Sequence, residues 1–355
     1  MEGLRVAGVT EVVIGKGLPS PLLPTRPDRR RVVILTQPAA SSKALEIAKA
    51  LRSEDLLAEV IGLPDREEAK TLSVAESVYE ALAKFGLSRG DTVIGVGGGT
   101  VTDLAGYVAG TWLRGVEVVH IPTTLLGAVD ASIGGKAGVN LAGKNLVGVI
   151  WHPRLVVVDI DVMDALPPTL LREGMAEAFK TGLVGDSELC SLVVSQGVHA
   201  PLEEVVRRSI AVKGAIVTRD EREHGERAYL NYGHTIGHAI EYASRLSHGE
   251  SVGLGMIAAS RMSERAHGFD GMEMVVSTID RLGLPTSVEG LDAARVLDLL
   301  RHDKKRDGKG LRMVLLREVE DPVLDHVEVS DIEIGMSAVG FEPGTVPGAE
   351  PRNRQ

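Results

Sequence analysis

The chain almost lacks cysteine: its 355 residues include only one, Cys190. A single cysteine cannot form a disulfide within the chain, and it excludes the multi-cysteine sites that hold structural zinc. The sequence also has no run of roughly 18 or more uninterrupted apolar residues, and its N-terminus lacks the apolar core of a secretory signal. We therefore expect a cytoplasmic protein without a membrane partner, in which histidine, aspartate or glutamate would hold any metal ion.

An excess of positive charge is also missing. The chain carries 39 lysines and arginines against 49 aspartates and glutamates, which gives a formal net charge of −10. A general nucleic-acid binder needs a basic face, so this class is excluded and any phosphate site must be local. Glycine, in contrast, is abundant: there are 41 glycines, whereas an average protein contains about 7%. Tight turns or close backbone approaches are expected.

The first part of the chain alternates two kinds of pattern. Helical spacing of apolar residues occurs at 41–53 and 72–86. Short valine- and isoleucine-rich segments, typical of buried strands, occur at 31–36, 58–62, 92–96, 116–121 and 155–160. Alternation of this kind predicts a Rossmann-like α/β domain with a parallel sheet, which binds its ligand at the carboxyl ends of the strands. We assign this domain to residues 1–165.

The remainder reads as an all-α domain over residues 166–340, beginning near Pro167 and Pro168. A charged loop around 302–305 precedes a strand-like segment at 311–316, and residues 341–355 are expected to form a flexible tail. The predicted helices are 169–185, 187–196, 200–219, 231–246, 249–267, 272–283 and 291–302. With a length that suits two domains, the chain is expected to combine an α/β and a helical domain.

A glycine-rich segment, GVGGGTVTDLAG at 95–106, follows a predicted strand and enters a predicted helix. Such glycines let the backbone approach a pyrophosphate at a helix N-terminus. The spacing differs from the usual G-x-G-x-x-G pattern, and a tight strand-to-helix turn remains an alternative. Thr123 and Thr124 end the next strand and favour a dinucleotide. Residues 65–70 could bind ribose hydroxyls through a carboxylate, or could simply be a solvated helix start.

A second glycine-rich segment runs from Asp130 to Asn145 and contains Lys136 and Lys144. Two lysines and an asparagine in a loop of this kind suit a phosphate group. The alternative is a mobile loop without a ligand.

Histidines and a glutamate predict a metal site in the helical part. His234 and His238 are one helical turn apart, while His248 and Glu177 lie in neighbouring motifs. Catalytic zinc takes three such ligands and leaves positions for water or substrate, but spacing alone does not decide which two histidines bind. Arg227 and Asn231 continue the helical spacing of His234 and His238, so an anion site, with Lys213, is one reading of these residues. The other reading is a solvated helix face without a ligand. Arg114 could likewise bind an anion or simply lie on the surface.

Together the motifs resemble those of the 3-dehydroquinate synthase family, within the sugar phosphate cyclases. The resemblance covers about residues 10–325 and is carried by GGGTVTDLAG, TWLRGV, IPTTLL, VDASIGGK, GKN, GMAEAFK, DEREHGERAYLNYGHTIGHAIE, SHGESV and DKK. It implies a homodimer that uses NAD and Zn²⁺, or Co²⁺, on the sugar acid phosphate 3-deoxy-D-arabino-heptulosonate 7-phosphate, in one active-site cleft. The implied reaction is transient oxidation, β-elimination of phosphate, re-reduction, ring opening and aldol closure to 3-dehydroquinate.

The resemblance also implies roles for individual residues. It makes Glu177, His234 and His248 the metal ligands, and Lys180, Asp130, Asn231 and His238 the catalytic or active-site polar residues. Arg114, contributed across the dimer, would bind substrate together with Lys136, Asn145, Lys213, Arg227, Lys304 and Lys305. Dinucleotide contacts would come from Glu67, Lys70, Gly98, Gly99, Asp103, Thr123, Thr124, Lys136 and Lys144. The sequence departs from the family pattern at Thr36-Gln37, where an acidic residue often follows the threonine, and in a loop between Lys136 and Lys144 that is one residue shorter.

Related activities remain as alternatives. Cyclases of sedoheptulose 7-phosphate or glucose 6-phosphate act on substrates without a carboxylate, which would leave Lys213 and Arg227 as unpaired buried cations. Aminodehydroquinate synthases act on a substrate that keeps the carboxylate, so this criterion does not distinguish them from 3-dehydroquinate synthases. It also does not distinguish an enzyme of primary metabolism from one of secondary metabolism. A polyol dehydrogenase would have no use for the phosphate-type cations. A non-catalytic NAD-binding regulator would be expected to lose some of Glu177, Lys180, His234 and His248.

Overall fold

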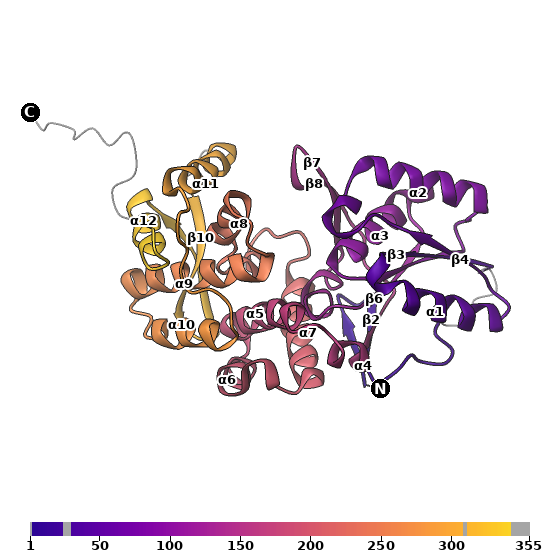
Figure 1. Ribbon diagram of the computed structural model, residues 1–355, viewed down its shortest axis with the longest axis horizontal. Helices are drawn as coiled ribbons and strands as arrows, with labels where there is room; N and C mark the ends of the chain where they lie inside the picture. The colour runs from indigo at the N-terminus through magenta and orange to yellow at the C-terminus, as the bar shows by residue number, and fades with distance from the viewer. Residues whose placement is uncertain (1, 24–29, 308–310, 342–355) are drawn as a thin grey trace, which may run out of the picture. The chain divides into compact units, whose positions relative to one another are not determined.

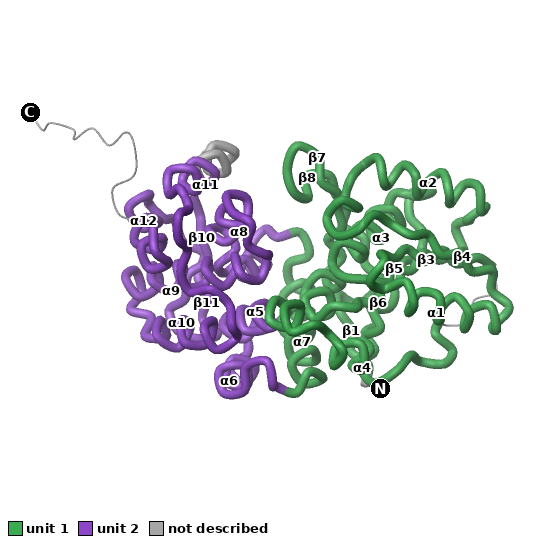
Figure 2. The backbone as a smooth tube through the Cα atoms, viewed as in Figure 1, with its two compact units in different colours: residues 1–174, 201–222 green, residues 175–200, 223–355 purple. Residues whose placement is uncertain are grey.

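The computed structural model describes residues 2–23, 30–307 and 311–341, and of residues 2 and 301–307 it describes the backbone alone (Figure 1). The chain forms two compact units, coloured green and purple in Figure 2. Unit 1 comprises Met1–Gly174 and Pro201–Arg222, and unit 2 comprises Met175–Ala200 and Glu223–Gln355. The side chains of Lys304 and Lys305, and residues 342–355 of the predicted tail, lie outside the described residues.

Unit 1 is built on a seven-stranded sheet with the order β1-β2-β9-β6-β5-β3-β4. All pairings are parallel except that of β1 with β2. This confirms the predicted α/β fold, although β1 and β2 were not among the predicted strands. The strands are β1 Glu2–Val6, β2 Thr10–Gly15, β3 Arg31–Thr36, β4 Leu57–Gly62, β5 Thr92–Gly97, β6 Glu117–Pro122 and β9 Leu155–Asp159.

Alternating side chains of the central strands bury two cores, one on each face of the sheet. Val33 and Leu35 pack with residues of α2 and α3, whereas Val32 and Ile34 pack with residues of α1. Because both faces are covered, these strands are apolar throughout, as parallel strands usually are. The helices of unit 1 are α1 Ser41–Ser53, α2 Leu72–Phe85, α3 Gly99–Thr111, α4 Ile160–Asp164, the first part of α5 Pro168–Gly185, and α7 Leu202–Arg219.

Helix α7 belongs to unit 1, although the sequence pattern placed it in a second domain starting at residue 166. It packs against β1, β2 and α4. Gly214 brings the helix so close to β1 that a Cβ atom there would lie 2.9 Å from Val6 Cγ2. The units therefore divide after Gly174, and the chain returns to unit 1 for α7.

The predicted loop over 130–145 is wrong for most of its length. A π-helical turn, η4 (Gly127–Ala131), is followed by an antiparallel ribbon of β7 (Lys136–Leu141) and β8 (Gly143–Ile150). Gly138 and Gly148 face each other in this ribbon, and a Cβ at either position would lie within 2.9 Å of a carbonyl oxygen of the partner strand. The glycines therefore permit close strand pairing rather than loop mobility.

Unit 2 is mainly helical. Its helices are the second part of α5, α6 Ser187–Gln196, α8 His234–Ala243, α9 His248–His267, α10 Met272–Arg281, α11 Ala293–Asp307 and α12 Val329–Ser337. A hairpin of β10 (Leu311–Glu318) and β11 (Asp321–Val327) accompanies them. The charged loop expected at 302–305 is wrong, because α11 continues to Asp307; lysine and arginine are good helix formers even where apolar periodicity ends. No helix in the described residues is long and apolar enough to cross a membrane.

Candidate functional site

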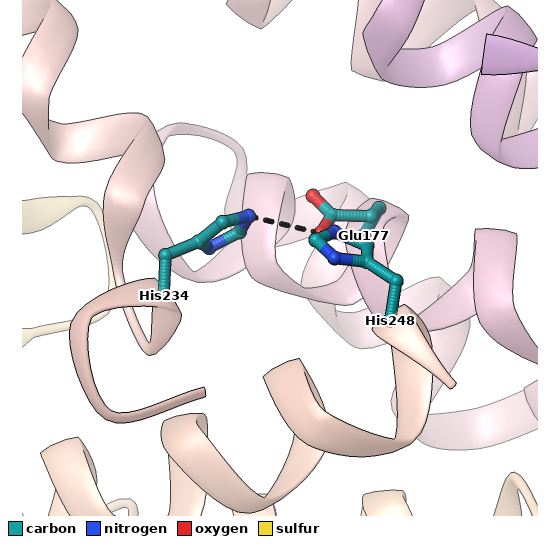
Figure 3. Close-up of side chains that lie close together, drawn as sticks. All are labelled: Glu177, His234 and His248. Atoms are coloured by element: carbon teal, nitrogen blue, oxygen red, sulfur yellow. Dashed lines mark ion pairs between the residues drawn. The ribbon is translucent and has the colours of Figure 1, made fainter. Parts of the chain in front are cut away.

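Three elements of unit 2 bring a glutamate and two histidines together (Figure 3). Glu177 lies on α5, His234 begins α8 and His248 begins α9. The Oε1 atom of Glu177 is 3.2 Å from Nε2 of His234 and 3.3 Å from Nε2 of His248. Glu177 is fully buried, and its Oε1 has no hydrogen-bond partner among the described residues. These three residues, which the family resemblance implies, form one of two candidate metal groups among the described residues; the other comprises His238, Glu241 and His248.

The second ring nitrogen of each histidine fixes the orientation of the first. His234 Nδ1 lies 3.2 Å from the carbonyl oxygen of Tyr232, and His248 Nδ1 lies 3.4 Å from Oε2 of Glu241. Both oxygens only accept hydrogen bonds, so each Nδ1 carries a proton, and a ring in its neutral form presents a lone pair at Nε2. Two such lone pairs and a carboxylate oxygen then converge on one point. This donor set fits a divalent cation such as zinc.

Charge within unit 2 also favours an ionised Glu177. Lys180 Nζ lies 2.5 Å from its Oε2, and both side chains are buried. Burial by itself would raise the pKa of Glu177, but Lys180, His234 and His248 together hold it well below its usual range. Burial by itself would lower the pKa of His248, but the neighbouring carboxylates of Glu177 and Glu241 raise it to about 10. Without a metal ion, a proton on His248 therefore compensates the negative charge of the neighbouring carboxylates, which a bound cation would otherwise neutralise.

Close packing of α8 on α9 positions the two histidines. Gly233, directly before His234, adopts a φ of +78°. Gly255 on α9 packs against Gly233 so closely that a Cβ on Gly255 would lie 1.9 Å from the Gly233 carbonyl oxygen. Ser247 begins α9 with a capping box that includes Glu250. The break at Gly233 shows that the expected helical stripe is wrong: Arg227 and Asn231 belong to a separate 3-10 turn, η6 (Glu226–Asn231).

The remaining predicted residues of unit 2 lie near the triad in sequence but differ in environment. His238 is exposed, and its ring centroid lies 5.1 Å from that of His234. Arg227 is buried. Asn231 Nδ2 donates to Oε1 of Glu223 at 2.5 Å. Sequence reasoning named neither Glu223 nor Glu241, although both lie in the segment DEREHGERAYLNYGHTIGHAIE and a carboxylate next to metal-type histidines is a recognisable signal.

In unit 1 the glycine-rich turn lies between β5 and α3, as predicted. Gly98 precedes the first residue of α3, and a Cβ on it would lie 3.3 Å from the side chain of Thr124. A Cβ on Gly99 would lie 3.1 Å from Ala131, and the Thr123 amide donates to the Gly97 carbonyl. Gly98, Gly99, Thr123 and Thr124 are thus brought together at the N-terminus of α3, where backbone N–H groups attract anions.

A polar network lies beside this turn. Lys70 is buried, and its Nζ donates to Asp103 Oδ2 at 2.7 Å and to Asn145 Oδ1 at 2.6 Å. Burial raises the pKa of Asp103, and Lys70 offsets part of that effect. Asn145, which is predicted to bind substrate, therefore contacts Lys70, which is predicted to bind the dinucleotide. Lys136 and Lys144 both lie on the ribbon, on β7 and β8.

Asp130 and Lys213 form a pair within unit 1. Lys213 Nζ on α7 lies 2.6 Å from both the carbonyl oxygen and Oδ1 of Asp130. Lys213 therefore has an anionic partner in the chain itself, and Arg227 is not without a partner either. The expectation that these cations would remain unpaired without a substrate carboxylate is wrong. Arg114 is exposed and follows Leu113; both have a left-handed backbone, with φ of 68° and 51°.

The fold and the site define a class: an α/β unit with a glycine-rich turn, accompanied by a helical unit with a histidine and glutamate triad. Comparison with known families agrees with it. Residues 60–173 match the family described as 3-dehydroquinate synthase N-terminal, and residues 174–306 match 3-dehydroquinate synthase C-terminal. The chain belongs to the 3-dehydroquinate synthase family.

Individual relatives are similar over most of the chain. A 3-dehydroquinate synthase of Saccharopolyspora erythraea is 42% identical over 323 residues, covering 88% of this chain and 87% of the relative. A solved 2-deoxy-scyllo-inosose synthase, in complex with carbaglucose-6-phosphate, NAD⁺ and Co²⁺, is 26% identical with a TM-score of 0.85, covering 95% of this chain and all of the other. The 2-epi-5-epi-valiolone synthase of Streptomyces hygroscopicus subsp. jinggangensis, solved with NAD⁺ and Zn²⁺, is 28% identical with a TM-score of 0.82, covering 92% and 96%.

Proposed function

We propose that the chain is a 3-dehydroquinate synthase that uses NAD and a divalent metal ion, Zn²⁺ or Co²⁺. It would convert 3-deoxy-D-arabino-heptulosonate 7-phosphate to 3-dehydroquinate and phosphate. The observation that carries the proposal is the convergence of Glu177, His234 and His248 beside Lys180, in a chain 42% identical to a curated 3-dehydroquinate synthase.

The overall reaction is redox-neutral. A ring alcohol is oxidised to a ketone, which acidifies the neighbouring C–H bond; loss of that proton and of phosphate forms a C=C bond. The ketone is then reduced back to an alcohol, and the ring opens and closes again by an intramolecular aldol reaction. When bound, the dinucleotide accepts and returns one hydride, and the metal ion polarises the hydroxyl that is oxidised.

We assign the metal to unit 2 and the dinucleotide to unit 1. Lys180, held by Glu177 at 2.5 Å, would assist deprotonation of the hydroxyl. Asp130, Asn231 and His238 would be the other active-site polar residues. Substrate would be bound by Arg114, Lys136, Asn145, Lys213, Arg227, Lys304 and Lys305. The dinucleotide would be bound by Glu67, Lys70, Gly98, Gly99, Asp103, Thr123, Thr124, Lys136 and Lys144.

Related cyclase activities compete with this proposal, and the pairing of Lys213 with Asp130 removes the charge argument against them. Sequence identity favours the synthase: two 3-dehydroquinate synthases are 42% and 40% identical to the chain, whereas the two solved cyclases are 26% and 28% identical. Substrate choice must therefore be measured directly.

The test is to incubate the purified full-length chain with NAD⁺, Zn²⁺ and each candidate substrate. These are the heptulosonate phosphate, its amino analogue, sedoheptulose 7-phosphate and glucose 6-phosphate. Phosphate release and the mass of the cyclic product are followed. We expect the highest kcat/KM with the heptulosonate phosphate. Turnover of sedoheptulose 7-phosphate without turnover of the heptulosonate phosphate would overturn the proposal.

Two lysine variants provide the matched control. Lys180→Met should reduce kcat by about a hundredfold or more, because it removes a proton-transferring group. Lys84→Met, at an exposed position of α2, should leave kcat unchanged. Equal activity of the two variants would contradict the role of Lys180.

We further infer that the protein acts as a cytoplasmic homodimer. Support comes from the exposed Leu113 and Arg114, whose left-handed backbone is costly for residues other than glycine and is typical of functional positions. Light scattering coupled to size exclusion tests the dimer: a mass of one chain, 37.7 kDa, at micromolar concentration would contradict it.

A further inference from the structure

A network of polar side chains in unit 1 joins the ribbon to the glycine-rich turn. Its members come from η2 (Arg66–Ala69) and the residue after it, from α3, from β7 and from β8. They are Glu67, Lys70, Thr100, Asp103, Asn140 and Asn145. Asn140 has no role in the proposed function, yet it contacts Glu67, Lys70 and Asn145.

Asn140 holds three groups at once. Its Nδ2 donates to Oε1 of Glu67 at 2.8 Å, and its Oδ1 accepts from the backbone N–H of Asn145 at 2.9 Å. Its own backbone N–H donates to the carbonyl oxygen of Lys70 at 2.7 Å. A backbone N–H can only donate and a carboxylate can only accept, so the orientation of the Asn140 amide is unambiguous.

These contacts fix the Glu67 carboxylate from both sides. Oε1 accepts from Asn140, and Oε2 accepts from Thr100 Oγ1 at 3.2 Å. Each carboxylate oxygen has two acceptor positions, so lone pairs are still available for the hydroxyls of a ribose. Asn145, which Asn140 holds through its backbone, has a left-handed φ of 54° and places its Oδ1 on Lys70.

We propose that Asn140 is a positioning residue for dinucleotide binding: it orients the Glu67 carboxylate toward a ribose hydroxyl and ties the ribbon to that carboxylate. The proposal rests on the proposed function, because it takes a dinucleotide as the ligand of unit 1. Its consequence is that dinucleotide affinity depends on a ribbon residue that touches no dinucleotide atom itself.

Asn140→Asp is the most informative variant. The introduced carboxyl can still accept from Asn145, but it replaces the donor that faces Glu67 with an acceptor of like charge. Two carboxylates so close together raise each other's pKa, and Lys70, whose Nζ lies 3.8 Å from Glu67 Oε1, offsets part of that rise. At pH 7.5 we expect NAD⁺ to bind about tenfold or more weakly than to the wild type, since a hydrogen bond to a charged group is lost. As the pH falls toward 5, one proton restores an O–H donor between the carboxyls, and the loss should shrink.

The experiment is calorimetric titration of the full-length protein with NAD⁺ between pH 5 and 8, with each variant's Kd divided by that of the wild type. Asn140→Ala should lose affinity at every pH, and its combination with Glu67→Gln should lose less than the two single losses multiplied together. Leu141→Ala is the control, because Leu141 is the next residue of the ribbon and its side chain is 53% exposed.

The outcomes separate the proposals. Wild-type protein that does not bind NAD⁺ would overturn the proposed function and this inference together. Wild-type protein that binds, with an unchanged Kd for Asn140→Asp, would overturn the inference alone. A loss of affinity in Asn140→Asp that does not depend on pH would also overturn the inference, because a general disturbance of the ribbon has no reason to respond to one proton. An equal loss of affinity in Leu141→Ala would overturn it as well.

Discussion

The carboxylate of Glu241 faces the ring of His248 on the side away from Glu177, with 3.4 Å between Oε2 and Nδ1. This contact keeps the proton on Nδ1 and leaves Nε2 for a metal ion. We predict that Glu241→Gln weakens Zn²⁺ binding by about tenfold to a hundredfold, as loss of such outer partners does elsewhere. Competition with a chromogenic chelator measures the affinity. Glu273→Gln, at an exposed position of α10, is the control; comparable affinities for the two variants would contradict the orienting role.

His120 predicts a pH dependence of stability. It is 4% exposed on β6, its Nδ1 has no hydrogen-bond partner among the described residues, and burial lowers its pKa from 6.5 to about 4. The unfolded chain therefore takes up the proton first, so the stabilising contribution is present above about pH 6.5 and is lost as the pH falls toward 4. Between pH 7.5 and 5 we expect a loss of about 2 kcal/mol that is absent in His120→Gln. Urea denaturation measures the free energy of unfolding at each pH. Parallel pH profiles of the wild type and His120→Gln would refute the assignment of this loss to His120.

Two glycines on α9 predict opposite effects of the same substitution. A Cβ on Gly255 would lie 1.9 Å from the Gly233 carbonyl oxygen, whereas a Cβ on Gly253 would meet Ile279 at an ordinary 3.4 Å. Gly255→Ala should lower the free energy of unfolding by about 3 kcal/mol through overpacking and weaken metal binding by displacing α8. Gly253→Ala should be neutral or gain up to about 1 kcal/mol from helix propensity. Denaturation of both variants, with Zn²⁺ titration, checks this; equal stabilities would show that α8 and α9 separate easily.

Much of the fold could be predicted from short-range patterns. The strands around Val32 to Leu35 and Val93 to Val96 are apolar throughout because both faces of the sheet are covered, and that pattern is visible without coordinates. The metal residues were also within reach: histidine spacing restricted the candidates to three, and the family resemblance chose His234 and His248 over His238. The structure brings Glu177, His234 and His248 together as one possible metal-binding group, and it also places His238 with Glu241 and His248, so the choice of ligands stays a prediction.

Other features depended on contacts between distant segments. The glycines between Gly134 and Gly143 predicted a loop, yet Gly138 pairs with Gly148 in an antiparallel ribbon. The break at Gly233, which has a φ of +78° and packs closely against Gly255 of α9, separates Arg227 from His234 although their spacing is helical. Lys213 seemed to await a substrate carboxylate until Asp130, 83 residues away in sequence, was found beside it.

What the sequence by itself determined is the chemistry available. With one cysteine, any metal site must use histidine, aspartate or glutamate; with an acidic total, any phosphate site must be local; and the glycines before α3 would let a phosphate approach the N-terminus of that helix. Apolar periodicity and glycine conformation act over a few residues, which is why they can be read directly. Only the tertiary structure decided which polar atoms face one another. Glu241 with His248, Asn140 with Glu67, and Asp130 with Lys213 each depend on the close packing of separate elements, and hydrogen-bond geometry is set at that level.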